Sequence, residues 1–512
     1  MNDRRVCVHG HFYQPPRENP WTGRIDPEPS AAPWPNWNER ITDECYGPNT
    51  AAELHGAGAG RVGERRRRNN FVSISFNVGP TLMAWLAEAR PAVHRRIVEA
   101  DAAGAARFGG HGGAIAQVHD HLILPLANAR DRRTQVKWGL ADFRHRFGRD
   151  AGGMWLPETA VDVPTLETLA ADGVRFTILA PHQAARVREP GGPWTDVAPD
   201  GGLDTGRAYV QRLPSGREIA LFFYEGSVAH GIAFDGLLHD GAELAGRLEG
   251  IALAGAAPRL GHVATDGESY GHHHAHGEMA LAWALDAIER DGRVGLTTYG
   301  GWLAAHPPEA EVECADATSW SCAHGVRRWA GGCDCGTGGA GWDYGWRGPL
   351  RRALNDLRDD LARRFEREAG RLLVDPWAAR DDYAELRLGR EAVSEAWWRR
   401  HLRPGADDAA RGEARRWLDM QAAALRMFTS CGWFFDDPAG LETRQVLRYA
   451  GRALDLAGLV DRGGEPDPEA APLFEALAAV RSNRSERWNA AAELRRILCD
   501  DRPAAAVSRP SP

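Results

Sequence analysis

The sequence lacks the features of a membrane, secreted or nucleic-acid-binding protein. No stretch of its 512 residues reaches 18 uninterrupted apolar residues, and its start runs into Val6–His9 without the apolar segment of a signal peptide. Its 62 basic residues are outnumbered by 70 acidic ones, so no positive field is available to hold a phosphate backbone. These absences predict a cytoplasmic protein without nucleic-acid or membrane partners.

Cysteine, glycine and proline are also too scarce for two further classes. Eight cysteines in a chain of this length are too few for a fold held together by disulfide bonds, and a cytosol would keep them reduced. The 58 glycines and 31 prolines make up less of the chain than the roughly 25–30% that marks low-complexity sequences. A hydrophobic content of 43% and 19 tryptophans can instead fill a large core. We therefore expect a globular protein.

The first three hundred residues repeat one pattern, in which a short apolar run ends in Gly, His, Asp or Glu and a segment of helical period follows. The pattern predicts α/β architecture with strands at Arg5–His9, Phe71–Asn77, Ala106–Gly109, Gly153–Leu156, Val174–Leu179, Ile219–Phe223, Leu260–Ala264 and Val294–Thr297. Seven or eight such units favour a (β/α)7-type incomplete TIM-like barrel. No Gly-x-Gly-x-x-Gly turn follows the first strand to support a doubly wound nucleotide-binding sheet.

The pattern changes in the second half of the chain. We expect a catalytic β/α barrel at 1–310 and a Cys-, Gly- and Trp-rich insert or connection at 311–346. Long Ala/Leu and charged stretches with helical spacing predict a helical C-terminal domain at 347–500. The Pro-, Ala- and Ser-rich end, 501–512, is expected to be a disordered tail.

Polar residues follow several of the expected strands. The carboxyl ends of the strands form the active-site face of a parallel barrel, so these positions are where reacting groups should lie. Four segments stand there: His9-Gly10-His11 with Gln14, His111 after the third strand, Trp155-Leu156-Pro157-Glu158, and Asp266-Gly267-Glu268-Ser269-Tyr270 with His272.

Two of these residues, Glu158 and Asp266, suit the cleavage of a glycosidic bond. That reaction needs one carboxyl group to attack the anomeric carbon or activate water and another to protonate the leaving oxygen. The two residues follow different strands that a barrel brings to one mouth. Aromatic rings nearby in sequence can cover sugar faces, and histidines can hydrogen-bond hydroxyl groups.

The same segments resemble the ordered sequence regions of glycoside hydrolase family 57, whose members act on α-glucans and related α-glycosides by a retaining mechanism. The family's His-x-His-Gln-Pro region is similar to His9-Gly10-His11 followed by Gln14-Pro15. Its Trp-x-Pro-Glu region is similar to Trp155–Glu158 and its Asp-Gly-Glu region to Asp266–Glu268. The resemblance implies that Glu158 is the nucleophile and Asp266 the acid/base.

The resemblance also implies a set of substrate contacts and an oligo- or polysaccharide substrate, without a cofactor. Its second region corresponds loosely to Gly110-His111-Gly112 and its fifth to Thr429–Phe435. The chain departs from the family in the inserted Phe12-Tyr13, in a missing aspartate after Ser430 and in a histidine run after Tyr270. Hydrolysis and glycosyl transfer both remain open. The implied contacts are His9, His11, Gln14, His111, Trp155, Glu268, Tyr270, His272 and Trp433.

Two alternative functions involve the same barrel. Asp266, Glu268 and the histidines from His272 onward could hold a metal for a polysaccharide hydrolase or deacetylase, as in related barrels. Consecutive histidines on an extended strand, however, point to alternate sides and cannot all face one ion. A non-catalytic glucan-binding protein is the third possibility, although such a protein has no need for a paired acid and nucleophile.

Cysteines of the insert form a second candidate metal site. Cys314, Cys322, Cys333 and Cys335, or three of them with His324, could bind a structural zinc ion. Their spacing is not the paired C-x-x-C form, and a Gly-rich loop with reduced cysteines is the alternative.

The retaining mechanism makes two predictions about the catalytic pair. The carboxyl groups of Glu158 and Asp266 should lie about 5–5.5 Å apart, against roughly 6.5–9.5 Å in an inverting enzyme. The negative charge of Glu158 and partial burial should raise the pKa of Asp266 and keep it protonated for the first step.

Overall fold

The computed structural model describes residues 3–54, 66–198, 202–336, 338, 341–389, 391–461 and 463–502. The chain forms two compact units, each assembled from separate stretches. The first comprises residues up to 14, 27–117 and 143–316, and the second comprises 15–26, 118–142 and the chain from 317 onward. Residues 503–512 of the expected tail lie outside the described residues.

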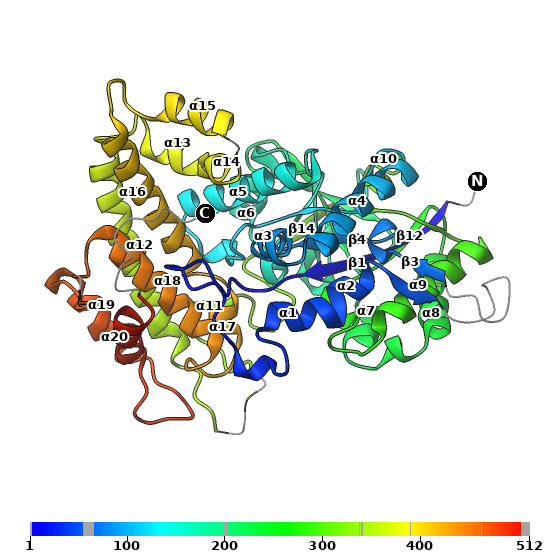
Figure 1. The fold of residues 1–512 in the computed structure, drawn as a ribbon. Helices are drawn as coiled ribbons and strands as arrows, with labels where there is room; N and C mark the ends of the chain where they lie inside the picture. The colour runs from blue at the N-terminus through cyan, green and yellow to red at the C-terminus, as the bar shows by residue number, and fades with distance from the viewer. Residues whose placement is uncertain are drawn as a thin grey trace. The chain divides into compact units, whose positions relative to one another are not determined.

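Parallel strands form the framework of the first unit (Figure 1). Ladders and single bridges join them side by side in the order β11, β7, β6, β5, β4, β1, β12, and every one of these pairings is parallel. A hydrogen bond from Glu225 N to His262 O (2.8 Å) links the segment after β11 to β12, so that the row of strands bends back on itself. This confirms the (β/α)7-type incomplete barrel. The strands are β1 (Arg4–Phe12), β4 (Ser75–Val78), β5 (Ala116–Gln117), β6 (Met154–Trp155), β7 (Phe176–Leu179), β11 (Glu218–Phe223) and β12 (Arg259–Asp266).

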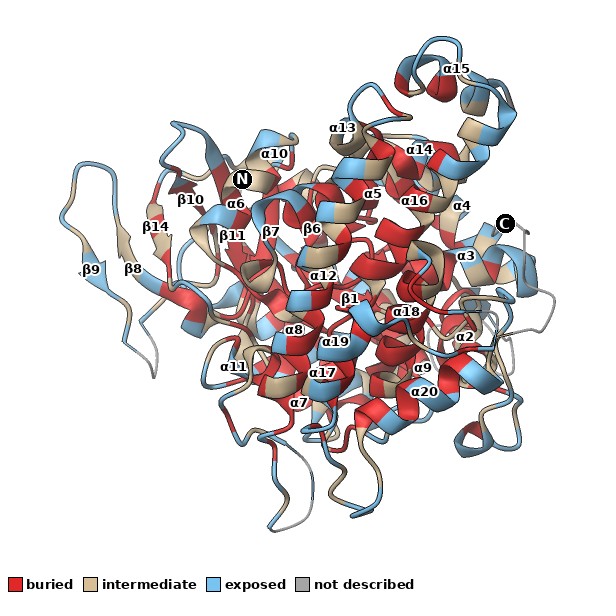
Figure 2. Ribbon diagram, turned by 90° about the vertical axis from the view of Figure 1, so that its left-hand side faces the viewer, coloured by how far each residue is buried: buried red, intermediate tan, exposed pale blue. Residues whose placement is uncertain are grey.

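Strand β1 is the centre of this framework. It pairs with β12 on one side, and on the other with β4 along its second half and with β13 (Gly295–Leu296) along its first half. All residues from Val6 to Phe12 are buried, as expected for a parallel strand covered on both faces. In Figure 2 the ribbon of β6, β7 and β11 is likewise mostly red, the colour of buried residues.

The third expected strand, Ala106–Gly109, is wrong. Those residues end helix α4 (Pro91–Arg107) and enter a turn in which Gly109 and Gly110 have positive φ. The third strand of the barrel is instead β5. It is only two residues long, so the sequence around it cannot be distinguished from that of a loop. The second strand is also shorter than expected, because Asn70–Val72 form a 3-10 turn before β4.

Antiparallel strands extend the sheet beyond β11. β10 (Ala208–Arg212) pairs antiparallel with β11, and beyond it follow β14 (Glu311–Cys314), β8 (Ala184–Arg188) and β9 (Thr195–Asp196). A separate ribbon joins β2 (Ala52–Leu54) to β3 (Arg66–Arg68). Helices connect the barrel strands: α1 (Trp37–Ile41), α2 (Gly47–Asn49), α3 (Pro80–Ala89), α4, α5 (Ala129–Phe147), α6 (Val163–Ala171), α7 (Gly226–Ala233), α8 (Gly241–Leu253), α9 (Gly277–Asp291) and α10 (Tyr299–Ala305).

The second unit is helical, as expected for the C-terminal region. In α12 (Arg347–Ala369) the buried residues Leu350, Leu354, Leu357, Leu361 and Phe365 recur every three or four positions and form one apolar face. α12 packs against α16 and α19, and α18 packs against α16 and α20. No helix among the described residues is both long and apolar enough to cross a bilayer. The remaining helices are α11 (Arg327–Ala330), α13 (Pro376–Asp381), α14 (Tyr383–Leu388), α15 (Glu391–His401), α16 (Asp408–Arg426), α17 (Cys431–Phe434), α18 (Leu441–Ala457), α19 (Ala471–Leu477) and α20 (Ala490–Asp500).

Candidate active site

Two histidines of β1 form a buried hydrogen-bond network with the neighbouring strands. His9 Nε2 lies 3.0 Å from Asn77 Oδ1, and the amide of Asn77 donates to His11 Nδ1 (2.8 Å) and to Gln117 Oε1 (2.7 Å). Burial lowers the pKa of both histidines to about 3, so both rings are neutral. Since His11 accepts at Nδ1, its proton lies on Nε2, where it can serve as a donor.

Trp155, at the end of β6, stacks against both histidines. Its ring centroids lie 4.9 Å from those of His9 and His11, and the planes are within 13° and 19° of parallel. Trp155 and His9 are each 0% exposed. Both rings are covered by protein in this structure, and the sugar contacts expected of them stay predictions. The stack fixes the end of β6, from which Glu158 follows.

Glu158 sits in a strained turn directly after β6. Its φ of 58° and ψ of 21° are in the left-handed region, and the next residue, Thr159, has a φ of 50°. Such a conformation costs a non-glycine residue roughly 1–3 kcal/mol and persists only where the surroundings hold it. The turn leaves Glu158 partly exposed while Pro157 and Thr159 on either side are buried.

Gln183, which follows β7, holds this turn. Its side chain accepts a hydrogen bond from Thr159 Oγ1 (2.8 Å) and donates one to Thr159 O (2.9 Å). Its Oε1 also accepts from Ala180 N (2.9 Å), and Gln183 is fully buried. The strained backbone beside Glu158 is thus supported by a residue from the adjacent strand end.

Asp266 is the last residue of β12 and lies opposite His11 in the parallel ladder. Its side chain is open to solvent, yet protein crowds it enough to restrict its hydration. That desolvation, together with the negative charge of Glu158, raises the pKa of Asp266 to about 7. The direction agrees with the expected rise, with restricted hydration as the larger cause and the charge of Glu158 as the smaller one.

Glu268 is a third, buried carboxyl group two residues after Asp266. Its Oε1 accepts hydrogen bonds from Tyr46 Oη (2.5 Å) and from Tyr13 N (3.0 Å). Burial and the charge of Asp266 raise the pKa of Glu268 to about 8. Between them stands Gly267, where a Cβ atom would come within 2.3 Å of the Phe12 ring. Only glycine fits there, which explains the residue between the two carboxyl groups.

The sequence reasoning missed several residues that complete the site. Asn77 and Gln117 link the histidines, and Tyr46 binds Glu268 from a position distant in sequence. Tyr224 follows β11, and the charge of Asp266 adds to burial in raising its pKa. Of these, only Tyr224 carried a signal, since the run Phe222-Phe223-Tyr224-Glu225 ends an expected strand with polar groups.

Other expected contacts occupy supporting positions. Tyr270 is 0% exposed, and its hydroxyl accepts from Thr265 Oγ1 (3.2 Å), so a sugar cannot reach it in this structure. Gln14 is buried, and its Nε2 donates to Tyr13 O (3.0 Å).

The expected position of His111 depends on the strand Ala106–Gly109, which the structure does not contain. His111 precedes β5, at the amino end of that strand rather than at the carboxyl end, and its expected sugar contact stays a prediction.

Trp433 belongs to the second unit, in α17. It is 0% exposed, and its indole nitrogen donates to Arg347 O (3.2 Å). It therefore packs inside the helical unit in this structure, and its expected sugar contact stays a prediction.

The histidine run after Tyr270 does not assemble a metal site with Asp266. His272 Nδ1 lies 2.5 Å from Glu44 Oε2, and His274 Nε2 lies 3.0 Å from Ala233 O. Among the residues that the structure describes, the one group of three or more His, Cys, Asp or Glu side chains placed to share an ion lies in the second unit. The metal-dependent alternative gains no support from this geometry.

The site can supply an acid and a nucleophile from one face of the barrel. Glu158 and Asp266 both stand at carboxyl ends of parallel strands, and the raised pKa keeps Asp266 substantially protonated near neutral pH. The neutral His11 and the buried Glu268 lie beside them as hydrogen-bonding groups.

Comparisons with known proteins match two parts of the chain to family models. Residues 115–315, which include Glu158 and Asp266, match glycosyl hydrolase family 57. Residues 342–497 match a domain of unknown function, DUF3536. No curated protein matches the chain in sequence.

Solved structures share the fold along nearly the whole chain. An exo-type maltose-forming amylase from a Pyrococcus species is 14% identical with a TM-score of 0.64, over 92% of this chain and 82% of that one. A 4-alpha-glucanotransferase from Thermococcus litoralis is 14% identical with a TM-score of 0.53, over 89% and 60%. A branching enzyme from Thermococcus kodakaraensis is 14% identical with a TM-score of 0.52, over 99% and 97%. At this identity the likeness shows the fold. The family match itself covers residues 115–315, the part of the chain that carries both carboxyl groups.

Proposed function

We propose that this protein is a retaining enzyme that cleaves or transfers α-glucan chains, with Glu158 as nucleophile and Asp266 as acid/base. The observation that carries the proposal is the electrostatic pairing of these carboxyl groups, through which the charge of Glu158 helps to raise the pKa of Asp266 to about 7. The match of residues 115–315 to glycosyl hydrolase family 57 supports the proposal, since both residues lie within it. The named activities of the three structural relatives, all directed at α-glucans, favour that substrate class.

In the first step, protonated Asp266 donates its proton to the glycosidic oxygen while the Glu158 carboxylate attacks the anomeric carbon. The bond to the leaving sugar breaks and a glycosyl ester forms on Glu158. In the second step, ionised Asp266 removes a proton from water or from a sugar hydroxyl, which displaces Glu158. Two inversions leave the product in the α configuration, and the incoming oxygen decides between hydrolysis and transfer.

The residues around the catalytic pair have two proposed roles: some contact the sugar, and others hold Glu158 and Glu268 in position. His11, Glu268 and His272 remain proposed contacts for sugar hydroxyls, since each can donate or accept a hydrogen bond beside the strand ends. Gln183 and Trp155 set the position of Glu158, and Tyr46 sets that of Glu268. Glu268 is mostly protonated at neutral pH, because burial raises its pKa to about 8. It therefore adds little negative charge to the site.

The test is product analysis of the purified protein with maltooligosaccharides, amylose, glycogen and trehalose. Cleaved or transferred glucan chains whose first-formed reducing ends are α by proton NMR would support the proposal. Release of the β anomer would overturn retention. Binding of glucans without any product over the whole panel would overturn catalysis and favour a glucan-binding protein.

A further inference from the structure

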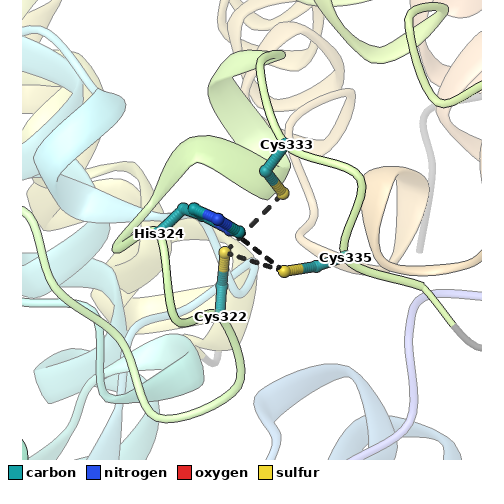
Figure 3. A group of neighbouring side chains, drawn as sticks. All are labelled: Cys322, His324, Cys333 and Cys335. Carbon is teal, nitrogen blue, oxygen red and sulfur yellow. Dashed lines mark hydrogen bonds between the residues drawn. The ribbon is translucent and has the colours of Figure 1, made fainter.

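Four side chains with metal-binding atoms converge in the segment that leads into α12. Cys322 Sγ lies 3.7 Å from Cys333 Sγ and 3.9 Å from Cys335 Sγ, and His324 Nδ1 lies 3.3 Å from Cys335 Sγ. One ligand atom from each of the four residues lies within 4.8 Å of all the others. Figure 3 shows the four side chains pointing toward a common centre.

These separations fit a tetrahedral zinc ion. Zinc binds thiolate sulfur at about 2.3 Å, and a tetrahedral angle then places two sulfurs about 3.8 Å apart. The observed sulfur separations of 3.7 and 3.9 Å lie on either side of that value. The cysteines are free thiols rather than disulfides, so all three sulfurs are available as ligands.

The local chain path brings two short pairs together. Cys322 and His324 belong to one turn, and Cys333 and Cys335 to a second stretch, with α11 between the two. Cys322 and Cys333 are 3% and 8% exposed, whereas His324 is exposed. The sulfurs therefore face inward, and the imidazole closes the group at the surface.

Two buried arginines supply a positive environment beside the cluster. Arg347 is fully buried, and its guanidinium donates to Cys335 O (2.8 Å) and to two carbonyl oxygens of α17 and the residue after it. Arg328 is also buried and stacks on the Phe434 ring at 4.5 Å. The Arg347 guanidinium also interacts electrostatically with the Asp436 carboxylate. Three thiolates, a neutral imidazole and Zn²⁺ carry a net charge of about −1, which would balance buried positive charge of this kind.

We propose that Cys322, His324, Cys333 and Cys335 bind one structural zinc ion in the helical unit. All four positions of a tetrahedral zinc are taken by protein ligands, which leaves none for water or substrate and marks the site as structural rather than catalytic. The ion joins the turn at Cys322 to the stretch at Cys335, and the Arg347 contact ties that stretch to the start of α12. Among the described residues of 317–346, α11 is the one regular element.

The ligand set differs from the four-cysteine version expected from the sequence. Cys314 lies in β14 of the first unit, where its backbone nitrogen donates to Gln211 Oε1 (2.9 Å), and His324 stands in its place as the fourth ligand. The two versions can be separated by experiment, because they disagree about one cysteine and one histidine.

The first experiment measures zinc in the full-length protein, expressed with added zinc and freed of loose metal by gel filtration. We expect about one zinc per chain, with X-ray absorption showing three sulfur ligands near 2.3 Å and one nitrogen near 2.0–2.1 Å. Less than a tenth of an equivalent, or a shell of oxygen ligands alone, would overturn the proposal. This measurement uses the unaltered protein and does not depend on any variant folding.

The second experiment assigns the ligands. Cys333→Ser and Cys335→Ser should lower the bound zinc at least tenfold, while the matched variants Cys314→Ser and Cys499→Ser should keep the full amount. His324→Ala should weaken zinc at least tenfold in competition with a chromophoric chelator and replace the nitrogen by oxygen in the absorption spectrum. Retention of the wild-type sulfur and nitrogen shell in His324→Ala, or loss of zinc in Cys314→Ser, would overturn this ligand set.

The third measurement separates a structural role from an adventitious one. A strong chelator should lower the thermal unfolding temperature of the wild-type protein, and added zinc should restore it. Unchanged unfolding after complete removal of zinc would overturn the structural role.

Discussion

The side chain of Gln183 forms two hydrogen bonds with Thr159, the residue after Glu158. It accepts from the Thr159 hydroxyl group (2.8 Å) and donates to the Thr159 carbonyl oxygen (2.9 Å). Thr159 and Glu158 have φ values of 50° and 58°, which side chains other than glycine rarely adopt. The contact spans two strand ends, since Gln183 follows β7 and Glu158 follows β6. A buried amide thus holds the backbone in the conformation that sets the direction of the proposed nucleophile.

Replacement of Gln183 by alanine should therefore disturb catalysis more than binding. A shift of the nucleophile by about 1 Å can cost roughly 100-fold in rate, so we expect kcat to fall about 10- to 100-fold with KM changed less than threefold. Gln211→Ala is the matched control, because Gln211 is also a buried glutamine. Its Oε1 accepts a hydrogen bond from Cys314 N in the antiparallel strands beyond β11. If kcat falls equally in both variants, the loss comes from general destabilisation of the fold and not from the position of Glu158.

Glu158→Gln should abolish turnover and leave the thermal unfolding temperature nearly unchanged. The amide keeps the size of the side chain but cannot form the glycosyl ester. Glu88→Gln, at an exposed position of α3, should retain wild-type activity. Substantial activity of Glu158→Gln on a competent substrate would remove Glu158 from the mechanism.

The pKa of Asp266 gives a prediction about pH. Because the acid must be protonated in the first step, kcat/KM should decline as pH rises above about 7. Carbon NMR of the labelled carboxyl group should show a lower pKa in Glu158→Gln than in the wild type, since the neighbouring charge is gone. It should stay above the ordinary value of 3.8, because burial is the larger cause of the rise. An identical pKa in both proteins would mean that the two carboxyl groups are too far apart to form a pair.

Glu268 makes stability depend on pH. Its pKa is about 8 in the folded protein against 4.5 when unperturbed, so folding takes up a proton between these values. The resulting stabilisation is complete below about pH 4.5 and is lost as the pH rises through 8. Glu268→Gln keeps an oxygen to accept from Tyr46 and removes the ionisation. Between pH 5 and pH 9 the free energy of unfolding of the wild type should fall by up to about 4 kcal/mol more than that of the variant. Parallel pH curves for the two proteins in urea unfolding would contradict the raised pKa.

A buried ion pair stabilises the helical unit. Arg380 Nη1 lies 2.8 Å from Asp131 Oδ1 and from Gln421 Oε1, and both members of the pair are almost fully buried. Asp131→Ala should lower the free energy of unfolding by about 3–5 kcal/mol, because it leaves the guanidinium buried without its counterion. Glu395→Gln, which breaks an exposed pair with Arg411, should cost less than about 1 kcal/mol. Similar losses in the two variants would show that burial of the Arg380 pair does not matter.

Much of the barrel could be predicted because its signals are local. A run of apolar residues that ends in a polar group reports a buried parallel strand and its carboxyl end together, which placed Glu158 and Asp266 on one face. Strands could not be predicted where the apolar run is too short or resembles that of a helix. The two residues of β5 look like a loop, and the end of α4 looked like a strand, so His111 was assigned to the wrong end of the barrel.

The alternation of strands and helices and the helical second half could thus be predicted from local sequence patterns, and short motifs suggested Glu158 and Asp266 as the proposed carboxyl pair. The covered side chains and their partners follow from the folded structure alone. Trp155 stacks against His9 and His11, Tyr46 donates to Glu268, and His324 rather than Cys314 lies with the three cysteines. The physical reason is that burial, pKa and metal-ligand geometry arise from contacts between segments far apart in sequence, and no local pattern encodes those distances.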